Sequence, residues 1–129
     1  MSITDNEPIT SITETVDSHL EAYTLADANR RRTLVAENWN PAGELTDPPL
    51  AGRGHAEISG LTDVVLAHYG GHRFERTTAV DAHHDFARYE WNLVAPDGTV
   101  AVSGTDFVQF DEAGKLLRIV GFFGPLAAC

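Results

Sequence analysis

Residues 100–110 read VAVSGTDFVQF, and this stretch decides how the chain is expected to fold. Side chains of a β-strand point alternately to its two faces, so the even-numbered positions share one face. The alternation predicts a half-buried strand and puts the Asp106 carboxyl among buried side chains, where an unpaired carboxylate is costly and tends to become protonated. The residues that share this face are Val100, Val102, Gly104, Asp106, Val108 and Phe110.

Two kinds of explanation for Asp106 remain open. In the structural one, a backbone amide or a buried arginine satisfies the carboxyl, or a bulge at Gly104 turns it outward. In the functional one, the carboxyl stays neutral in an apolar cavity and donates a hydrogen bond to a ligand oxygen. The functional explanation predicts a pKa of Asp106 well above the ordinary value of about 3.9.

The rest of the sequence extends this strand into an α+β fold. Further strands are expected over residues 72–82, 85–95 and 115–123, with turn signals at 96–98 and 111–114. Helices are expected from a capping-box sequence at residues 11–14, over residues 28–38, and from Gly54 to a stop at Gly70-Gly71. A short strand should follow the breaker at residues 40–43 and run into Asp47.

This order of elements predicts one domain over residues 9–126, after a polar tail at 1–8 that is expected to be disordered. Three helices followed by an antiparallel meander predict a curved mixed or antiparallel sheet wrapped around the helices. The chain has 129 residues, which suits a single domain.

The first helix carries a polar side chain in its apolar stripe. Ile12, Val16, Leu20 and Tyr23 follow helical spacing, and His19 lies within the same arc of about 100°. The His19 side chain is therefore expected to face the interior.

Composition limits the partners of the protein. The formal net charge of −10 repels phosphate backbones and anionic lipid, so neither nucleic acid nor a membrane is expected as a partner. Arg30-Arg31-Arg32 is read as a solvated helix face. The single cysteine, Cys129, gives no sign of an oxidising compartment, and with no signal peptide in the sequence we expect a cytoplasmic location.

Several short motifs occur in a characteristic order. That order resembles the SnoaL-like, ketosteroid-isomerase-like branch of the nuclear transport factor 2 superfamily over about residues 12–124. The resemblance implies a cone-shaped fold that encloses an apolar cavity. The motifs are Leu45-Thr46-Asp47-Pro48, Gly52-Arg53, Ser103-Gly104-Thr105-Asp106-Phe107, Asp111-Glu112-Ala113-Gly114-Lys115 and Gly121-Phe122-Phe123.

The resemblance also implies roles for three residues. In ketosteroid isomerases an Asp-Pro at the end of the first strand supplies the general base, and Asp47 occupies that position. A second aspartate, in a context like that of Asp106, stays protonated and donates to the developing oxyanion. The other donor is a tyrosine on the first helix, where counting back from the Ala26-Asp27 turn places His19, a departure from the family pattern. The residues expected to line the cavity are Val16, Tyr23, Trp39, Trp91, Val108 and Phe122.

Simpler roles for these residues stay open. Asp47 before Pro48 is also an ordinary turn residue, and a carboxylate there could cap a turn or the third helix. His19 is also read as a hydrogen-bonded core histidine. The sequence thus allows an isomerase- or cyclase-type acid–base catalyst for an apolar carbonyl compound, or a non-catalytic binding or dimerisation module of the same fold.

No cofactor or metal is expected. His83-His84-Asp85 lies at a predicted hairpin tip, where adjacent side chains should diverge rather than converge on an ion. A homodimer through the second face of the sheet is expected, since that face is neither strongly polar nor core-like. Its residues in the central strand are Thr99, Ala101, Ser103, Thr105, Phe107 and Gln109.

Overall fold

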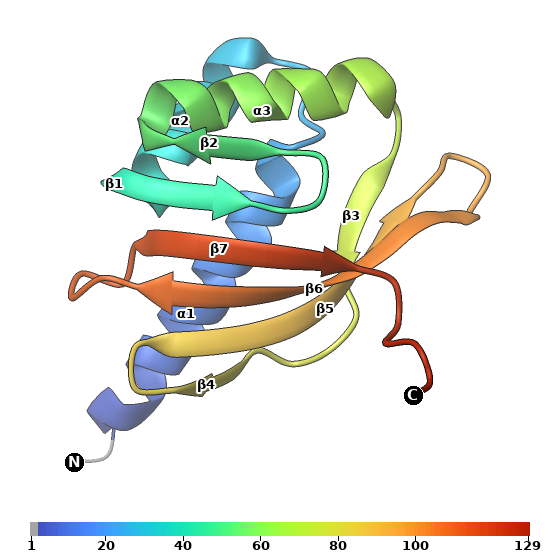
Figure 1. The fold of residues 1–129 in the computed structure, drawn as a ribbon. Helices are drawn as coiled ribbons and strands as arrows, with labels where there is room; N and C mark the ends of the chain where they lie inside the picture. Colours follow the sequence, from blue (N-terminus) through green and yellow to red (C-terminus); the bar gives the residue numbers. More distant parts are fainter. Residues whose placement is uncertain (1–2) are drawn as a thin grey trace.

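The computed structural model describes residues 3–129, and their side chains from residue 12 onward. It contains three helices and seven strands in the order shown in Figure 1. The elements are α1 (Ile3–Ala22), α2 (Ala28–Asn38), β1 (Trp39–Thr46), β2 (Ala51–Arg53), α3 (Gly54–His68), β3 (Arg73–Arg76), β4 (Asp81–His83), β5 (Phe86–Val94), β6 (Val100–Phe110) and β7 (Leu116–Phe123).

The strands form one curved sheet that does not close on itself. The strand order is β2-β1-β7-β6-β5-β3, and β4 pairs with β5 beside this path. Strands β1 and β7 pair in parallel, whereas the other neighbours are antiparallel, so the sheet is mixed. Helix α1 crosses one face of the sheet, and α3 lies over the β1–β2 edge (Figure 1). The predicted α+β fold with a curved sheet around three helices is confirmed.

The core lies between the inner face of the sheet and the helices. Val16 and Leu20 from α1 belong to the same buried apolar cluster as Trp39 at the start of β1 and inward side chains of β5, β6 and β7. On β6 the buried residues are Gly104, Asp106, Val108 and Phe110, which confirms the predicted phase over residues 104–110. Val100, expected on the same buried face, is exposed instead, because the register with β5 shifts near this end of the strand. Apolar alternation therefore determined which face of the sheet is buried.

Three boundaries differ from expectation. Helix α1 begins at Ile3 rather than near residue 11, and the expected cap at Ser11 and the tail at residues 1–8 lie outside the described side chains. The breaker at residues 40–43 lies inside β1, which begins at Trp39 rather than after the breaker, and the register with β7 shifts there. Strand 72–82 is split into β3 and β4, because Thr78 Oγ1, rather than a backbone carbonyl, accepts the hydrogen bond from Glu90 N (3.0 Å).

The arginine cluster is not uniformly solvated, which corrects one expectation. Arg31 is buried, and its guanidinium donates to the carbonyl oxygens of Leu25 and Ala26 at 2.6 and 3.0 Å. It also forms a salt bridge with Asp63 on α3. Arg31 thus ties the turn that follows α1 to α3.

No described helix is long and apolar enough to cross a membrane.

Candidate active site

The Asp106 carboxyl is held by two side chains of the neighbouring strand. The Tyr89 hydroxyl donates to Asp106 Oδ2 at 2.7 Å, and the Trp91 indole Nε1–H donates to Asp106 Oδ1 at 3.1 Å. The antiparallel register places Tyr89 directly opposite Asp106 and Trp91 opposite Gly104. All three side chains are buried. The carboxyl is therefore satisfied by a phenol and an indole, and not by the backbone amide, buried arginine or outward bulge that the sequence left open.

Gly104 makes the second of these hydrogen bonds possible. A Cβ at this position would lie 2.4 Å from Trp91 Cζ2 and 2.7 Å from the carbonyl oxygen of Phe122, closer than non-bonded atoms approach. The indole therefore lies directly over the bare backbone of β6. From there its Nε1 reaches the carboxyl two residues along the strand.

Burial sets the protonation of Asp106. Burial is the largest effect and raises the pKa of this carboxyl to about 6. The hydrogen bonds from Tyr89 and Trp91 lower the pKa, and the charge of Asp47 raises it by a smaller amount. Desolvation disfavours the charged form, whereas donors stabilise it. The predicted upward shift is confirmed, and Asp106 exchanges its proton close to neutral pH.

Asp47 directly follows β1, and its side chain both stabilises a turn and lines a pocket. Its Oδ1 accepts from Leu50 N at 3.0 Å, and the two backbones exchange hydrogen bonds, so the side chain does stabilise a turn. The same side chain is half-buried and faces a pocket. Burial raises the pKa of Asp47, partly offset by the Leu50 amide.

Gly121 on β7 separates the two carboxylates. A Cβ on this residue would lie 2.9 Å from Asp106 Oδ1 and 3.1 Å from the Asp47 Cβ. The parallel pairing of β1 with β7 brings Asp47 to this place, and the antiparallel register sets Gly121 opposite Asp106. The Asp106 carboxyl and the Asp47 side chain therefore lie close together over backbone that carries no side chain.

Both carboxylates face an apolar pocket of about 270 Å³. Its floor is the inner face of the sheet, and the last turn of α3 covers it, with Val65, His68 and the following Tyr69 along the wall. Pockets that enclose drug-sized ligands usually measure about 300–1,000 Å³, so this one suits a small molecule. Its aromatic walls are formed by Tyr23, Tyr69, Phe74, Trp91 and Phe123.

His19 does not line this pocket. It is buried behind it, with its ring edge-on to the rings of Tyr23 and Trp39 at centroid distances of 5.0 and 5.7 Å. Burial lowers the pKa of His19 to about 3, so the imidazole is neutral at physiological pH. The expectation that His19 faces the interior is confirmed, but it is Tyr23 and not His19 that lines the pocket.

Tyr23 follows the last residue of α1, and its hydroxyl is available to a ligand. Among the described residues none forms a hydrogen bond with this hydroxyl. Burial raises the pKa of Tyr23 well above its usual value, and the charges of Asp106 and Asp47 raise it further, so the phenol keeps its proton.

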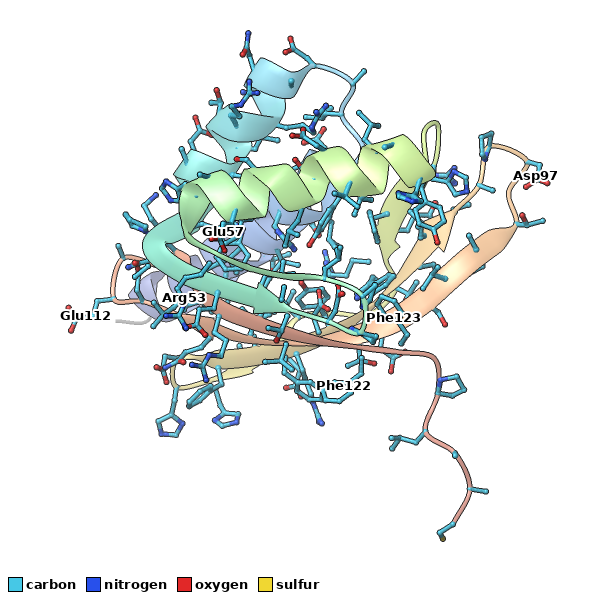
Figure 2. The ribbon with its side chains drawn as sticks, turned by 45° about the horizontal axis from the view of Figure 1, so that its top comes forward. Arg53, Glu57, Asp97, Glu112, Phe122 and Phe123 are labelled. Atoms are coloured by element: carbon cyan, nitrogen blue, oxygen red, sulfur yellow. The ribbon has the colours of Figure 1, made fainter. Side chains whose placement is uncertain are left out.

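The expected lining residues divide into three groups. Tyr23 and Trp91 line the pocket, and Val16, Trp39 and Val108 pack in the core instead. Phe122 is exposed on the outer face of the sheet, and Figure 2 shows Phe122 and Phe123 on opposite sides of β7.

The sequence did not lead us to expect Tyr89 at the site, although its position among the alternating residues of strand 85–95 was a usable signal.

The pair at the β4–β5 turn also differs from expectation. The side chains of His83 and His84 converge, with their Nδ1 atoms 3.0 Å apart, because His84 adopts a left-handed backbone with φ of 54°. No group of three or more potential metal ligands occurs among the described residues.

Comparison with known proteins identifies the family. No protein-family model and no curated protein matches the sequence. Among solved structures, a SnoaL-like family protein from Agrobacterium tumefaciens, named as a candidate isomerase, aligns with a TM-score of 0.84 at 30% identity. The alignment covers 90% of this chain and 99% of that protein.

Two structures at lower identity share the fold. A candidate SnoaL-like polyketide cyclase from Jannaschia Sp. CCS1 aligns with a TM-score of 0.68 at 16% identity, covering 88% of this chain and 85% of that one. A ketosteroid isomerase-like protein from Catenulispora acidiphila, solved in complex with trimethylamine, has a TM-score of 0.68 at 15% identity over 86% and 85% of the chains. Because the match to the Agrobacterium protein spans almost the whole of both chains at 30% identity, this chain belongs to the SnoaL-like family.

Proposed function

We propose that this protein is an isomerase- or cyclase-type acid–base catalyst that moves a proton next to the carbonyl group of a small apolar metabolite. The observation that carries the proposal is the pair of carboxylates, Asp47 and Asp106, facing one apolar pocket across Gly121. Paired carboxyls whose environments differ are a common arrangement for dividing base and acid roles. The names of the family's structural relatives support the same class of reaction.

The two carboxyls differ in their hydrogen bonds, which suggests how they divide the work. Asp47 accepts only from a backbone amide and acts as the general base that removes a proton from the carbon next to the carbonyl. The electron pair of that C–H bond moves to the carbonyl oxygen. Protonated Asp106 and the Tyr23 hydroxyl donate hydrogen bonds to this oxyanion, and Asp47 then returns the proton to another carbon.

His19 has a supporting role in this proposal. Its neutral ring packs edge-on against Tyr23 and so fixes the direction of that phenol.

Hydrogen–deuterium exchange tests the proposal. Enones and β-keto esters in D₂O should exchange faster with the protein than in buffer, and Asp47→Asn should lower the rate by about 10²–10⁴-fold. Tyr23→Phe and Asp106→Asn should each lower it by about 10²–10³-fold. Glu112→Gln, at the exposed tip between β6 and β7 (Figure 2), is the matched carboxyl-to-amide control and should leave the rate unchanged.

The pH profile supplies a second criterion. Catalysis needs Asp47 ionised and Asp106 protonated, so the rate should rise as Asp47 loses its proton and fall as pH increases through about 6, the pKa of Asp106. If no compound of the panel exchanges faster than in buffer, the catalytic proposal fails and a non-catalytic binding module is favoured.

We also propose that the protein forms a homodimer through the outer face of the sheet. Phe107 and Phe122 are 45% and 57% exposed there, with their ring centroids 5.9 Å apart. They line an open groove together with Leu126 of the C-terminal segment. Adjacent exposed aromatic rings of this kind are typical of association surfaces.

Sedimentation tests the dimer. The wild type should sediment above the 14.0 kDa of one chain at micromolar concentration, and Phe107→Ser combined with Phe122→Ser should sediment as a monomer. Val100→Ser, a similarly exposed apolar residue outside the groove, is the control and should stay dimeric. A wild type that sediments only as a 14.0 kDa species would contradict the proposal.

A further inference from the structure

The charged side chains that line the pocket are acidic. Asp47 and Asp106 both face it, and among its described lining residues none is lysine or arginine. His68 is the one histidine among the described lining residues. Two carboxylates that face an apolar space without a basic partner leave a negative potential there, which repels anionic ligands and attracts cationic ones.

The end of α3 adds to this potential. The last turn of the helix, with Val64, Val65 and His68, lies along the pocket, and Tyr69 caps it. The C-terminus of a helix carries the negative end of its dipole, which favours nearby positive charge. This contribution is independent of the protonation of the two carboxyls.

The aromatic walls form a connected series of rings. Tyr23 contacts Phe74 at a centroid distance of 5.0 Å, Phe74 contacts Trp91 at 5.2 Å, and Trp91 contacts Phe123 at 5.7 Å. The last two contacts are close to perpendicular, at 70° and 90°, so neighbouring rings face in different directions around the pocket. Sites that bind quaternary ammonium groups are built from such faces, which attract cations through the ring quadrupole.

From these observations we propose that the pocket binds a small organic cation, a methylated or protonated amine, between the aromatic rings and the carboxylates of Asp47 and Asp106. The positive charge of the ammonium group offsets one of the two carboxylate charges and is attracted by both, and its methyl groups fill the apolar space. A volume of about 270 Å³ accommodates a molecule of the size of choline. The proposal goes beyond the proposed function, because it concerns the pocket above about pH 6, where Asp106 is ionised. It holds whether or not the bound molecule reacts.

Isothermal titration calorimetry with two isosteric probes tests the proposal. Choline and 3,3-dimethyl-1-butanol have nearly the same shape, but a neutral carbon replaces the charged nitrogen in the second. Choline should bind the wild-type protein about tenfold or more tightly than the alcohol, through contacts with ring faces and carboxylates. Because choline has no carbonyl group, the result is independent of the exchange assay and of its failure.

Variants then assign the preference to particular side chains. Asp47→Asn and Asp106→Asn should weaken choline binding and leave binding of the alcohol unchanged. Phe74→Leu keeps the wall apolar but removes a ring, so it should also weaken choline selectively. Glu112→Gln should change neither affinity.

Three outcomes would overturn the inference. The first is an equal affinity of the wild-type protein for 3,3-dimethyl-1-butanol and for choline. The second is the absence of detectable choline binding at millimolar concentration. The third is unchanged choline affinity in the Asp47→Asn, Asp106→Asn double variant. The first two need no variant, so a variant that fails to fold does not weaken the test.

Discussion

His19 and Asp106 are buried titratable side chains in neighbouring regions of one core, and their surroundings differ. The His19 region is a packed aromatic contact with Tyr23 and Trp39, where burial lowers the pKa of the imidazole to about 3. The Asp106 region has two donors and an adjoining pocket, and there the pKa of the carboxyl rises to about 6. Burial neutralises both groups, but only Asp106 keeps a pKa close to neutrality.

The two regions also oppose each other in the pH dependence of folding. The folded pKa of His19 lies below its unfolded value of 6.5, so its stabilising contribution is present above pH 6.5 and is lost as pH falls toward 3. The folded pKa of Asp106 lies above its unfolded value of 3.8, so its contribution is present below pH 3.8 and is lost as pH rises through about 6. Between about pH 4 and 6 the two effects partly cancel.

The largest expected effect comes from removing the histidine. His19→Gln removes a group whose pKa falls from 6.5 to about 3 on folding. At about 1.36 kcal/mol per pKa unit, this shift lowers the free energy of unfolding by about 5 kcal/mol between pH 6.5 and 3. Without it, the free energy of unfolding should increase as pH falls from 6 to 4, because the raised pKa values of Asp106 and Asp47 then act without the opposing effect of His19. Urea denaturation at several pH values measures this. The exposed His83→Gln is the control, and a variant that follows the wild-type profile would disprove the shift.

Removing the carboxyl should have the opposite effect. Asp106→Asn removes a pKa shift that corresponds to about 3 kcal/mol of folding free energy. Relative to wild type, the variant should gain free energy of unfolding as pH increases from 4 to 7, since the wild type alone must ionise a buried acid. The same denaturation series with Glu112→Gln as the reference tests this, and equal slopes for variant and wild type would contradict it.

A smaller effect is expected from filling the space under the indole. Gly104→Ala should lower the free energy of unfolding by about 1–3 kcal/mol, because the new methyl group overlaps Trp91. Displacing the indole also removes a donor, so the pKa of Asp106 should rise further in a carboxyl NMR titration.

Gly60→Ala on α3 is the matched control for this change. A Cβ there meets nothing within 4 Å, and alanine is the better helix former, so this variant should be as stable as the wild type or more so. If Gly104→Ala were equally tolerated, the indole would not depend on the bare backbone of β6.

The smallest effect on stability should come from the Tyr23 hydroxyl. Tyr23→Phe should change the free energy of unfolding by no more than about 0.5 kcal/mol, because no described residue bonds to this hydroxyl. Tyr89→Phe is its partner experiment and should cost about 1.5–3 kcal/mol, since it removes a hydrogen bond to Asp106. Equal losses of unfolding free energy in the two variants would show that the Tyr23 hydroxyl also forms a hydrogen bond.

The sequence predicted the inner face of β6 because strict alternation leaves one register for a half-buried strand. It did not predict the partners of Asp106, since these depend on how β5 is aligned with β6. Phe122 was expected on the wrong side because β7 is apolar on both faces, so its pattern does not fix which residues point inward. Tyr23 and His19 share one apolar stripe, and only the end of α1 at Ala22 shows which of them reaches the pocket.

The parallel pairing of β1 with β7 determines when the site can form as well as where it lies. The contact between Glu44 and Arg118 in this pairing joins residues 74 positions apart. Closing so long a loop is slow and entropically unfavourable, so we expect these strands to pair after the local hairpins of β5, β6 and β7. Asp47 would then meet Asp106 only in the nearly complete fold, and folding intermediates would lack the pocket even where Asp106 already has both of its donors.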